Sequence, residues 1–208
     1  MSFPTTSVLD DFNRADSSTL GANYAADPYN FGHSSCQILS NQVAKNVTDG
    51  SNYWSAATFG PDSESYIDLP TLPTVETVLG VRLLSPATTG VDGYLLLESI
   101  GSPDGWSIFR VDNGGLTQLG ATVSQDISAG DSIGLEVIGS TLKGYRKNAG
   151  TWAEIISRTD STYTSAGNIS STYCVDASIR ADNFGGGTVV VASVTATSTI
   201  MMMTGVGM

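Results

Sequence analysis

The sequence is poor in basic residues, in histidine and in cysteine. Its 208 residues include 9 Lys and Arg, 1 His and 2 Cys against 20 Asp and Glu, which gives a formal net charge of −11. An acidic surface repels phosphate backbones and anionic lipid heads, so we expect neither nucleic acid nor membrane as a partner. The few basic residues form no cluster that would neutralise a uronate, which argues against a glycan lyase.

Long apolar runs are also missing. No segment approaches the ~20 apolar residues that span a bilayer. The start, MSFP, has neither the basic region nor the apolar stretch of a secretory signal. We therefore expect a protein that is made in a cytoplasm and stays soluble, or leaves by a route such as cell lysis.

The two cysteines, Cys36 and Cys174, lie toward opposite ends of the chain. A cytoplasm keeps thiols reduced, which favours two separate buried thiols. Pairing of the end strands would bring the two residues together, and a disulfide formed after lysis is the alternative. Two cysteines and one histidine show no zinc-ligand spacing, so no metal site of that kind is predicted.

What the sequence does have is a series of short strands. Apolar residues alternate in segments that recur roughly every 8–12 residues, and no stretch keeps a helical period. The clearest hairpin joins 133–138 to 142–147 through Gly139-Ser140, and a weaker pattern at 36–45 predicts a strand pair around Ser40-Asn41. The segment 75–84 predicts a strand with Glu76 and Arg82 on one face and apolar residues on the other.

Two similar motifs stand near the ends of the chain. The segment 10–24 reads DDFNRADSSTLGANY, and 181–187 reads ADNFGGG. They predict that the first and last strands lie side by side, with the rings of Phe12 and Phe184 buried and the acids at the rim. A sheet closed by its own termini hides edges that would otherwise invite aggregation.

The segment 10–24 resembles the opening of concanavalin A-like, or laminin G-like, jelly-roll domains, many of them on bacteriophage particles. Residues 129–142 and 162–169 are similar to that family too, so the resemblance covers roughly residues 8–187. It implies an all-β concanavalin A-like jelly-roll sandwich of two antiparallel sheets. We place this domain at residues 1–197, with an apolar tail at 198–208. The fold carries binders, enzymes and structural proteins alike, so the resemblance alone does not settle the function.

No catalytic pattern is found. Glycan-cleaving enzymes of this family carry Glu-x-Asp-x-x-Glu or Glu-x-Asp-x-Glu on one strand, which aims the acids into one cleft. The nearest run, ESYID at 64–68, has another spacing and no third acid, and we expect a solvated strand face there. His33 stands without a Gly-x-Ser-x-Gly elbow and is expected to be a loop or packing residue. We predict no catalytic residues, no enzymatic activity and no cofactor.

Two kinds of ligand remain as alternatives. Calcium would need the carboxylates of Asp10, Asp11 and Asp16, with Asp182 brought close by strand pairing. The competing interpretation is that these acids cap backbone N–H groups of turns, so no metal site is predicted. Glycan would need an aromatic stacking platform, although aromatic residues in strands usually pack in a core. The candidates for that platform are Trp54, Trp106, Trp152, Tyr53 and Tyr94.

The tail is apolar and uncharged. We predict that Ile200, Met201, Met202 and Met203 contact another subunit, because methionine adapts to irregular surfaces. An additional strand on the domain's own sheet is the alternative.

Elimination and resemblance together predict a structural, non-enzymatic bacteriophage virion protein. We expect a capsid decoration protein that is made in the host cytoplasm and binds and stabilises the shell. Its expected partners are capsid or other virion subunits, with homo-oligomers in the particle. One alternative is a tail or receptor-binding protein that recognises host-surface glycan. The other is a free carbohydrate-binding module or a glycan-active enzyme.

Overall fold

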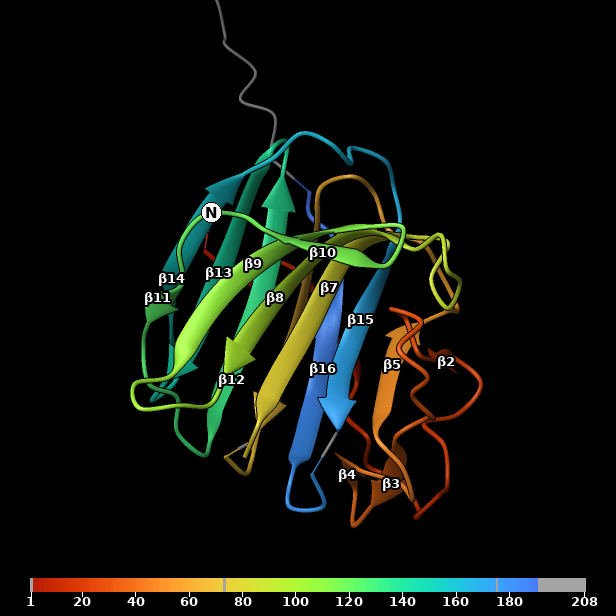
Figure 1. Ribbon diagram of the computed structural model, residues 1–208. Helices are drawn as coiled ribbons and strands as arrows, with labels where there is room; N and C mark the ends of the chain where they lie inside the picture. Colours follow the sequence, from red (N-terminus) through yellow and green to blue (C-terminus); the bar gives the residue numbers. More distant parts are fainter. Residues whose placement is uncertain (1, 73, 175, 191–208) are drawn as a thin grey trace, which may run out of the picture.

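The protein is a sandwich of two antiparallel β-sheets (Figure 1). The computed structural model describes residues 2–72, 74–174 and 176–190. Every regular element in these ranges is a strand, which confirms the predicted all-β sandwich. None of the described residues forms a helix long and apolar enough to cross a bilayer.

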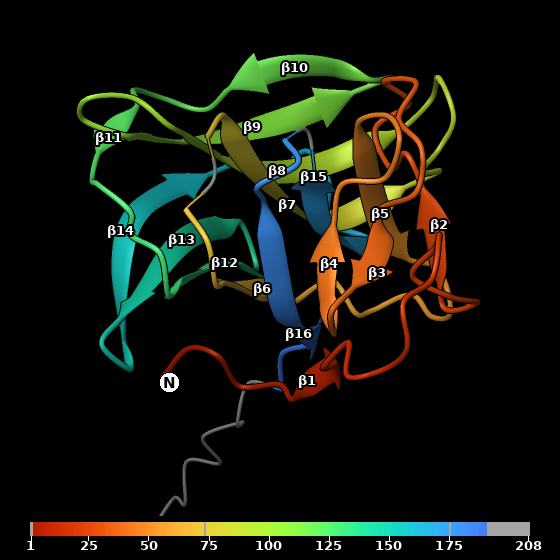
Figure 2. The ribbon, with the colours of Figure 1, turned by 90° about the horizontal axis from the view of Figure 1, so that it is seen from below.

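Each sheet has eight strands. Sheet I has the order β14-β13-β12-β6-β16-β4-β3, with β1 paired to β16. Its strands are β1 (Val8–Asp10), β3 (Gln37–Leu39), β4 (Gln42–Ala44), β6 (Ser63–Leu69), β12 (Asp131–Ile138), β13 (Thr141–Asn148), β14 (Thr151–Thr159) and β16 (Arg180–Thr188). Sheet II has the order β10-β9-β8-β7-β15-β5-β2, with β11 paired to β9. Its strands are β2 (Tyr24–Ala26), β5 (Gly50–Trp54), β7 (Glu76–Leu84), β8 (Asp92–Ser99), β9 (Gly105–Asp112), β10 (Gly115–Gln118), β11 (Val123–Ser124) and β15 (Asn168–Cys174). Figure 2 shows the two layers from below.

The main core lies between the sheets and follows from strand alternation. Ile133, Leu135 and Val137 of β12 point inward and are fully buried, as are Leu79 and Val81 of β7. Successive side chains of a strand point to opposite faces, so every second residue of these strands enters the core. Full burial of one such side chain stabilises the fold by about 1.5–3 kcal/mol.

The two end motifs meet as the sequence predicts. Strand β1 pairs with β16, and Asp10 lies opposite Phe184. The rings of Phe12 and Phe184 are both 0% exposed, and each lies 6.1 Å from the ring of Tyr24. Figure 2 shows β1 beside β16 at the lower side of the sandwich. The hairpins at Gly139-Ser140 and Ser40-Asn41 are also confirmed.

The predicted alternation of side chains along β7 is wrong at the C-terminal end of the strand. A bulge there breaks the alternation, and Arg82 takes φ 51°. Its side chain is 1% exposed and donates hydrogen bonds to the carbonyls of Pro61, Tyr163 and Gly139. Arg82 therefore ties sheet II to loops at the end of sheet I and does not share a face with Glu76. Leu83, expected beside Leu79 and Val81, instead joins a smaller apolar cluster with Val78.

Candidate functional site

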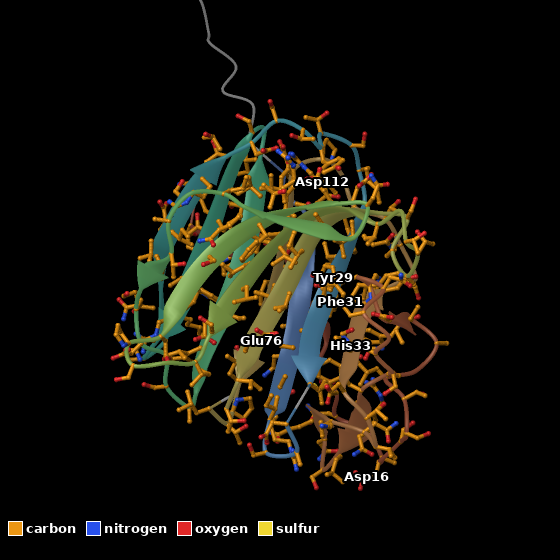
Figure 3. The ribbon with its side chains drawn as sticks, viewed as in Figure 1. Asp16, Tyr29, Phe31, His33, Glu76 and Asp112 are labelled. Carbon is orange, nitrogen blue, oxygen red and sulfur yellow. The ribbon has the colours of Figure 1, made fainter. Side chains whose placement is uncertain are left out.

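The segment after β2 forms the edge of a hollow of about 470 Å³. We call it the Phe31 hollow, and it is lined by Phe31, Gly32, His33, Lys45, Val47, Thr48 and Asp49. Figure 3 shows Tyr29, Phe31 and His33 following one another along this side of the sandwich. The hollow thus combines one aromatic ring with several polar side chains.

Phe31 is exposed but well supported. Its side chain is 48% exposed, whereas neighbouring Tyr29 is 2% exposed. The ring centre of Phe31 lies 5.7 Å from that of Tyr29 and 5.8 Å from that of His33, the latter edge-on at 74°. Tyr29 is itself anchored, because its hydroxyl and that of Ser170 form a buried 2.8 Å hydrogen bond. These contacts fix the position of the exposed ring.

The backbone of this loop is held by one aspartate. Asp27 takes φ 55°, and its carboxylate accepts hydrogen bonds from the backbone N–H of Phe31 at 2.7 Å and of Gly32 at 2.8 Å. Gly32 takes φ 83°, a left-handed conformation that glycine adopts without steric cost. An Asp side chain that bonds nearby backbone N–H groups stabilises such a turn without a strand or helix.

The polar groups of the hollow come from neighbouring segments. Lys45 Nζ lies 2.8 Å from Asp49 Oδ1, and Thr48 donates a 2.7 Å hydrogen bond to the Ser34 hydroxyl. A 3.1 Å hydrogen bond joins His33 Nδ1 and Ser51 Oγ. His33 is a loop and packing residue, as predicted. An apolar ring beside a few placed polar groups is the usual composition of a small-ligand site.

A pair of carboxylates lies on the outer face of sheet I. Glu64 on β6 and Glu136 on β12 are directly opposite in the strand ladder, so their Cβ atoms are roughly 5 Å apart on one face. The pKa of Glu136 is raised above its ordinary value, mainly by burial and further by the neighbouring Glu64 carboxylate. The hydroxyl of Tyr145 donates a 3.1 Å hydrogen bond to Glu136 Oε1 and offsets part of this increase. Sequence reasoning missed this pair because the partners are far apart in the chain.

The start of the chain covers Glu64, one member of this pair. Glu64 is 0% exposed, and its Oε1 accepts hydrogen bonds of 2.6–3.3 Å from the backbone N–H and hydroxyl groups of Thr5 and Thr6. Its Oε2 is buried without a partner among the described residues. The solvated strand face expected for Glu64 is therefore wrong, because residues 3–6 cover it.

Phe3 anchors the covering segment. Its ring stacks on Tyr145 with ring centres 4.2 Å apart and meets Trp152 edge-on at 4.9 Å. Figure 2 shows the first residues running below β12 and β6 toward β1. Beside the segment a hollow of about 290 Å³ remains, lined by Glu136, Ile138, Thr141, Lys143 and Tyr145.

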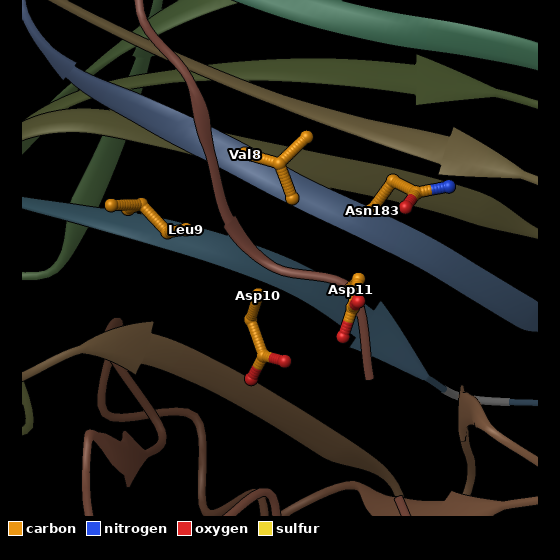
Figure 4. A pocket seen from close by; sticks show the side chains of 5 residues that line it. All are labelled: Val8, Leu9, Asp10, Asp11 and Asn183. Atoms are coloured by element: carbon orange, nitrogen blue, oxygen red, sulfur yellow. The ribbon is translucent and has the colours of Figure 1, made fainter. Parts of the chain in front are cut away.

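A third hollow, of about 580 Å³, lies where β1 meets β16 (Figure 4). Val8, Leu9, Asp10, Asp11 and Asn183 line it. Asp10 forms two hydrogen bonds with the guanidinium of Arg14, at 2.6 and 3.0 Å. Asp10 and Asp11 also accept backbone N–H bonds from residues 12 and 13.

The other acids proposed for calcium act in the same way. Asp16 accepts a 2.7 Å bond from Ser40 N–H, and Asp182 one of 2.8 Å from Asn183 N–H. The pKa of Asp182 is raised, mainly by burial and also by the carboxylate of Asp68. The hydrogen bond from Asn183 offsets part of this increase. Among the described residues no group of three or more His, Cys, Asp or Glu side chains is arranged to hold a metal. All four of these carboxylates accept backbone N–H bonds, and that of Asp10 also binds Arg14.

The structure does not gather the candidate aromatic residues into one platform. Trp106 and Tyr94 are 0% exposed and belong to the core. Trp54 packs against Tyr24, and Trp152 lies on the other sheet. Phe31, which was not among these candidates, carries an exposed ring instead. The predicted partner contact at 200–203 lies outside the described residues.

Comparisons with known proteins support the fold. No family model and no curated protein matches the chain. Among solved structures, the carbohydrate binding module CBM66 from Bacillus subtilis is 16% identical, with a TM-score of 0.57 over 81% of this chain and 98% of that one. The VIP36 exoplasmic/lumenal domain in its Ca²⁺/Man2-bound form is 14% identical, with a TM-score of 0.60 over 89% of this chain and 88% of that one. A xylan beta-1,4-xylosidase from Bacillus halodurans C-125 is 13% identical, with a TM-score of 0.56 over 86% of this chain but 38% of that one. At these identities the similarity shows the lectin-like jelly-roll fold and confirms that prediction.

Proposed function

We propose that this protein is a non-enzymatic, lectin-like carbohydrate-binding domain, and that the Phe31 hollow holds the sugar. The observation that carries the proposal is the ring of Phe31, which is 48% exposed yet fixed between Tyr29 and His33. The fold adds support, since a carbohydrate binding module and a domain solved with Man2 share it.

The chemistry of the hollow fits a sugar ring. The C–H face of a pyranose stacks on an aromatic ring, while its hydroxyls need donors and acceptors placed around the edge. Lys45, Thr48 and Asp49 supply both kinds of group. The net charge of −11 disfavours sulfated or uronate-rich glycans. We therefore assign neutral hexose-containing glycans as the ligand class.

The outer face of sheet I supports binding without cleavage. A retaining glycosidase needs two carboxyl groups about 5 Å apart that both reach the glycosidic bond. Glu64 is 0% exposed and lies beneath Thr5 and Thr6. No substrate reaches it while this segment is in place.

A glycan array followed by calorimetry tests the proposal. We expect a neutral glycan to bind the wild type, and Phe31→Ala to weaken binding by about 2 kcal/mol, roughly 30-fold. Leu116→Ala is the matched control, because Leu116 is a similarly exposed apolar side chain, at 44%, on β10. It should leave the affinity unchanged.

Two outcomes would reject this function. In the first, no glycan on a broad array binds. In the second, Phe31→Ala binds as the wild type does while Tyr145→Ala or Lys143→Ala abolishes binding, which would move the site to the hollow on sheet I.

The place of this domain on a phage particle stays a proposal that rests on the motif at 10–24. Protein stoichiometry of purified particles tests it. A capsid decoration protein is present in a fixed high copy number, whereas a tail protein that recognises host glycan is present in few copies. A free module is absent from the particles.

A further inference from the structure

The two cysteines lie together in the core. Cys36 and Cys174 are both 0% exposed and belong to the same apolar cluster, and both are reduced. Cys36 directly precedes β3 of sheet I, whereas Cys174 ends β15 of sheet II. Both thiols are buried and form no disulfide, as favoured from the sequence. They are nevertheless neighbours, as the packing around Gly50 shows.

Gly50 makes the room for this contact. Cys174 lies directly opposite Gly50 in the ladder between β15 and β5, so its side chain points to the face on which a Gly50 side chain would lie. The backbone nitrogen and Sγ of Cys36 are each 3.0 Å from the position of a Cβ at Gly50. Cys36 therefore occupies the space above Gly50, beside Cys174.

We propose that Cys36 and Cys174 are an oxidisable pair that closes to an intramolecular disulfide and joins the two sheets behind the Phe31 hollow. The proposal does not depend on the ligand assigned to that hollow.

The bond forms by exchange with a small disulfide such as oxidised glutathione. One cysteine loses its proton, and its thiolate attacks the glutathione disulfide and releases one glutathione thiolate. The second cysteine then loses its proton and attacks the protein sulfur of this mixed disulfide, which releases the second glutathione. The two cysteine sulfurs are oxidised, one glutathione disulfide is reduced, and the two released thiolates take up the two protons.

Burial sets when the reaction takes place. Desolvation, and then the hydrogen bond with Cys174, raise the pKa of the Cys36 thiol, which disfavours the reactive thiolate in the closed protein. Exchange therefore proceeds during folding, or when the segment before β3 opens. Once formed, the bond closes a loop from residue 36 to residue 174, and long loops restrict the unfolded chain most.

The bond would act on the loop that carries Phe31. The N–H of Cys36 donates a 2.8 Å hydrogen bond to Asn52 Oδ1, and Ser34 pairs with Gly50 in an isolated bridge. Cys36 thus anchors the end of this loop to β5. A bond between Cys36 and Cys174 would prevent local unfolding in which the loop that carries Phe31 detaches from β5.

The test refolds the full chain from denaturant with either a mixture of oxidised and reduced glutathione or reduced glutathione alone. Unreacted thiols are then alkylated under denaturing conditions. We expect the oxidised sample to be monomeric, to lose two hydrogens in intact mass and to take up no alkylating reagent. Trypsin should release peptides 15–45 and 159–180 as one linked species. Its Tm should exceed that of the reduced sample by about 10 °C.

Cys36→Ser and Cys174→Ser are the matched controls. Each keeps one thiol, so oxidation should add glutathione or a second chain and should not raise Tm. The proposal is wrong if the wild type behaves like these variants and keeps two thiols that react separately. It is also wrong if the linked species forms but its Tm is equal to or lower than that of the reduced protein. That result would mean that the disulfide distorts the native arrangement of the two cysteines.

Discussion

Glu98 on β8 lies directly opposite Thr77 on β7, and both side chains face the interior of the sandwich. Glu98 is 0% exposed, and neither of its carboxylate oxygens has a partner among the described residues; the Thr77 hydroxyl likewise has none there. Burial, with a contribution from the charge of Asp104, raises the pKa of Glu98 to about 8. The carboxyl group is therefore protonated in the folded protein at neutral pH.

This position predicts a pH-dependent loss of stability. The pKa of Glu98 is higher in the folded state than its ordinary value of 4.5, so the folded protein binds more protons between these two values. The free energy of unfolding therefore falls as pH rises from about 4.5 to about 8, by up to about 5 kcal/mol from this group. Glu98→Gln stays neutral, so it should match the wild type at pH 5 and be more stable at pH 9. Urea unfolding at both pH values measures the difference.

Glu76→Gln is the control for this prediction, because Glu76 lies at the partly exposed start of β7. It should differ from the wild type by the same small amount at both pH values. If the free energies of unfolding of the wild type and of Glu98→Gln change in parallel from pH 5 to pH 9, then Glu98 ionises normally and the prediction is wrong.

The buried rings that close the fold predict large cavity effects. Phe12 and Phe184 are each 0% exposed, so Phe→Ala at either position should lower the free energy of unfolding by about 3–5 kcal/mol. Phe31→Ala removes the same atoms from a side chain that is 48% exposed, and it should cost less than about 1 kcal/mol. Chemical denaturation of the three variants provides the test. Equal losses at positions 12 and 31 would contradict the assigned burial.

The fold was predictable because its signals are local. Alternation at Ile133, Leu135 and Val137 marks a strand with one buried face, and Gly139-Ser140 marks the hairpin that follows. Arg82 departs from the same rule, because a bulge depends on how β7 pairs with β8.

The candidate sites were less predictable because they depend on distant pairings. Glu64 and Glu136 are opposite one another only because β6 pairs with β12, and no local pattern sets that register. The exposure of Phe31 depends on the Asp27 turn and on Tyr29, whose hydroxyl reaches Ser170 on β15. A sequence shows the residues of such a site but not which surfaces remain open around them.

The apolar tail remains a prediction about assembly. The strand β16 already has neighbours in sheet I, β6 on one side and β4 and β1 on the other. We therefore expect truncation after Thr197 to leave the Tm of the isolated domain nearly unchanged and to weaken its attachment to other subunits. Differential scanning calorimetry and co-sedimentation with purified particles measure the two effects. A truncated domain that melts many degrees lower and still attaches would identify residues 200–203 as an internal strand.

The last prediction concerns the segment that covers Glu64 of the Glu64–Glu136 pair. Gly134 on β12 lies under Phe3, and a Cβ at that position would be 2.3 Å from the Phe3 ring. Gly134→Ala therefore cannot coexist with the observed ring position, and it should displace Phe3 from Tyr145 at a cost of about 1–3 kcal/mol.

A double-mutant cycle separates displacement of the ring from other effects of the new methyl group. Phe3→Ala alone should lower stability, since the ring is 8% exposed and packs on Tyr145 and Trp152. In that background Gly134→Ala should cost almost nothing, because the atoms that it clashes with are gone. Amide hydrogen exchange at Thr5 and Thr6 should be faster in either single variant, because these N–H groups lose their protected bonds to Glu64. Additive stability losses with unchanged exchange at Thr5 and Thr6 would show that Phe3 does not hold the segment on the sheet.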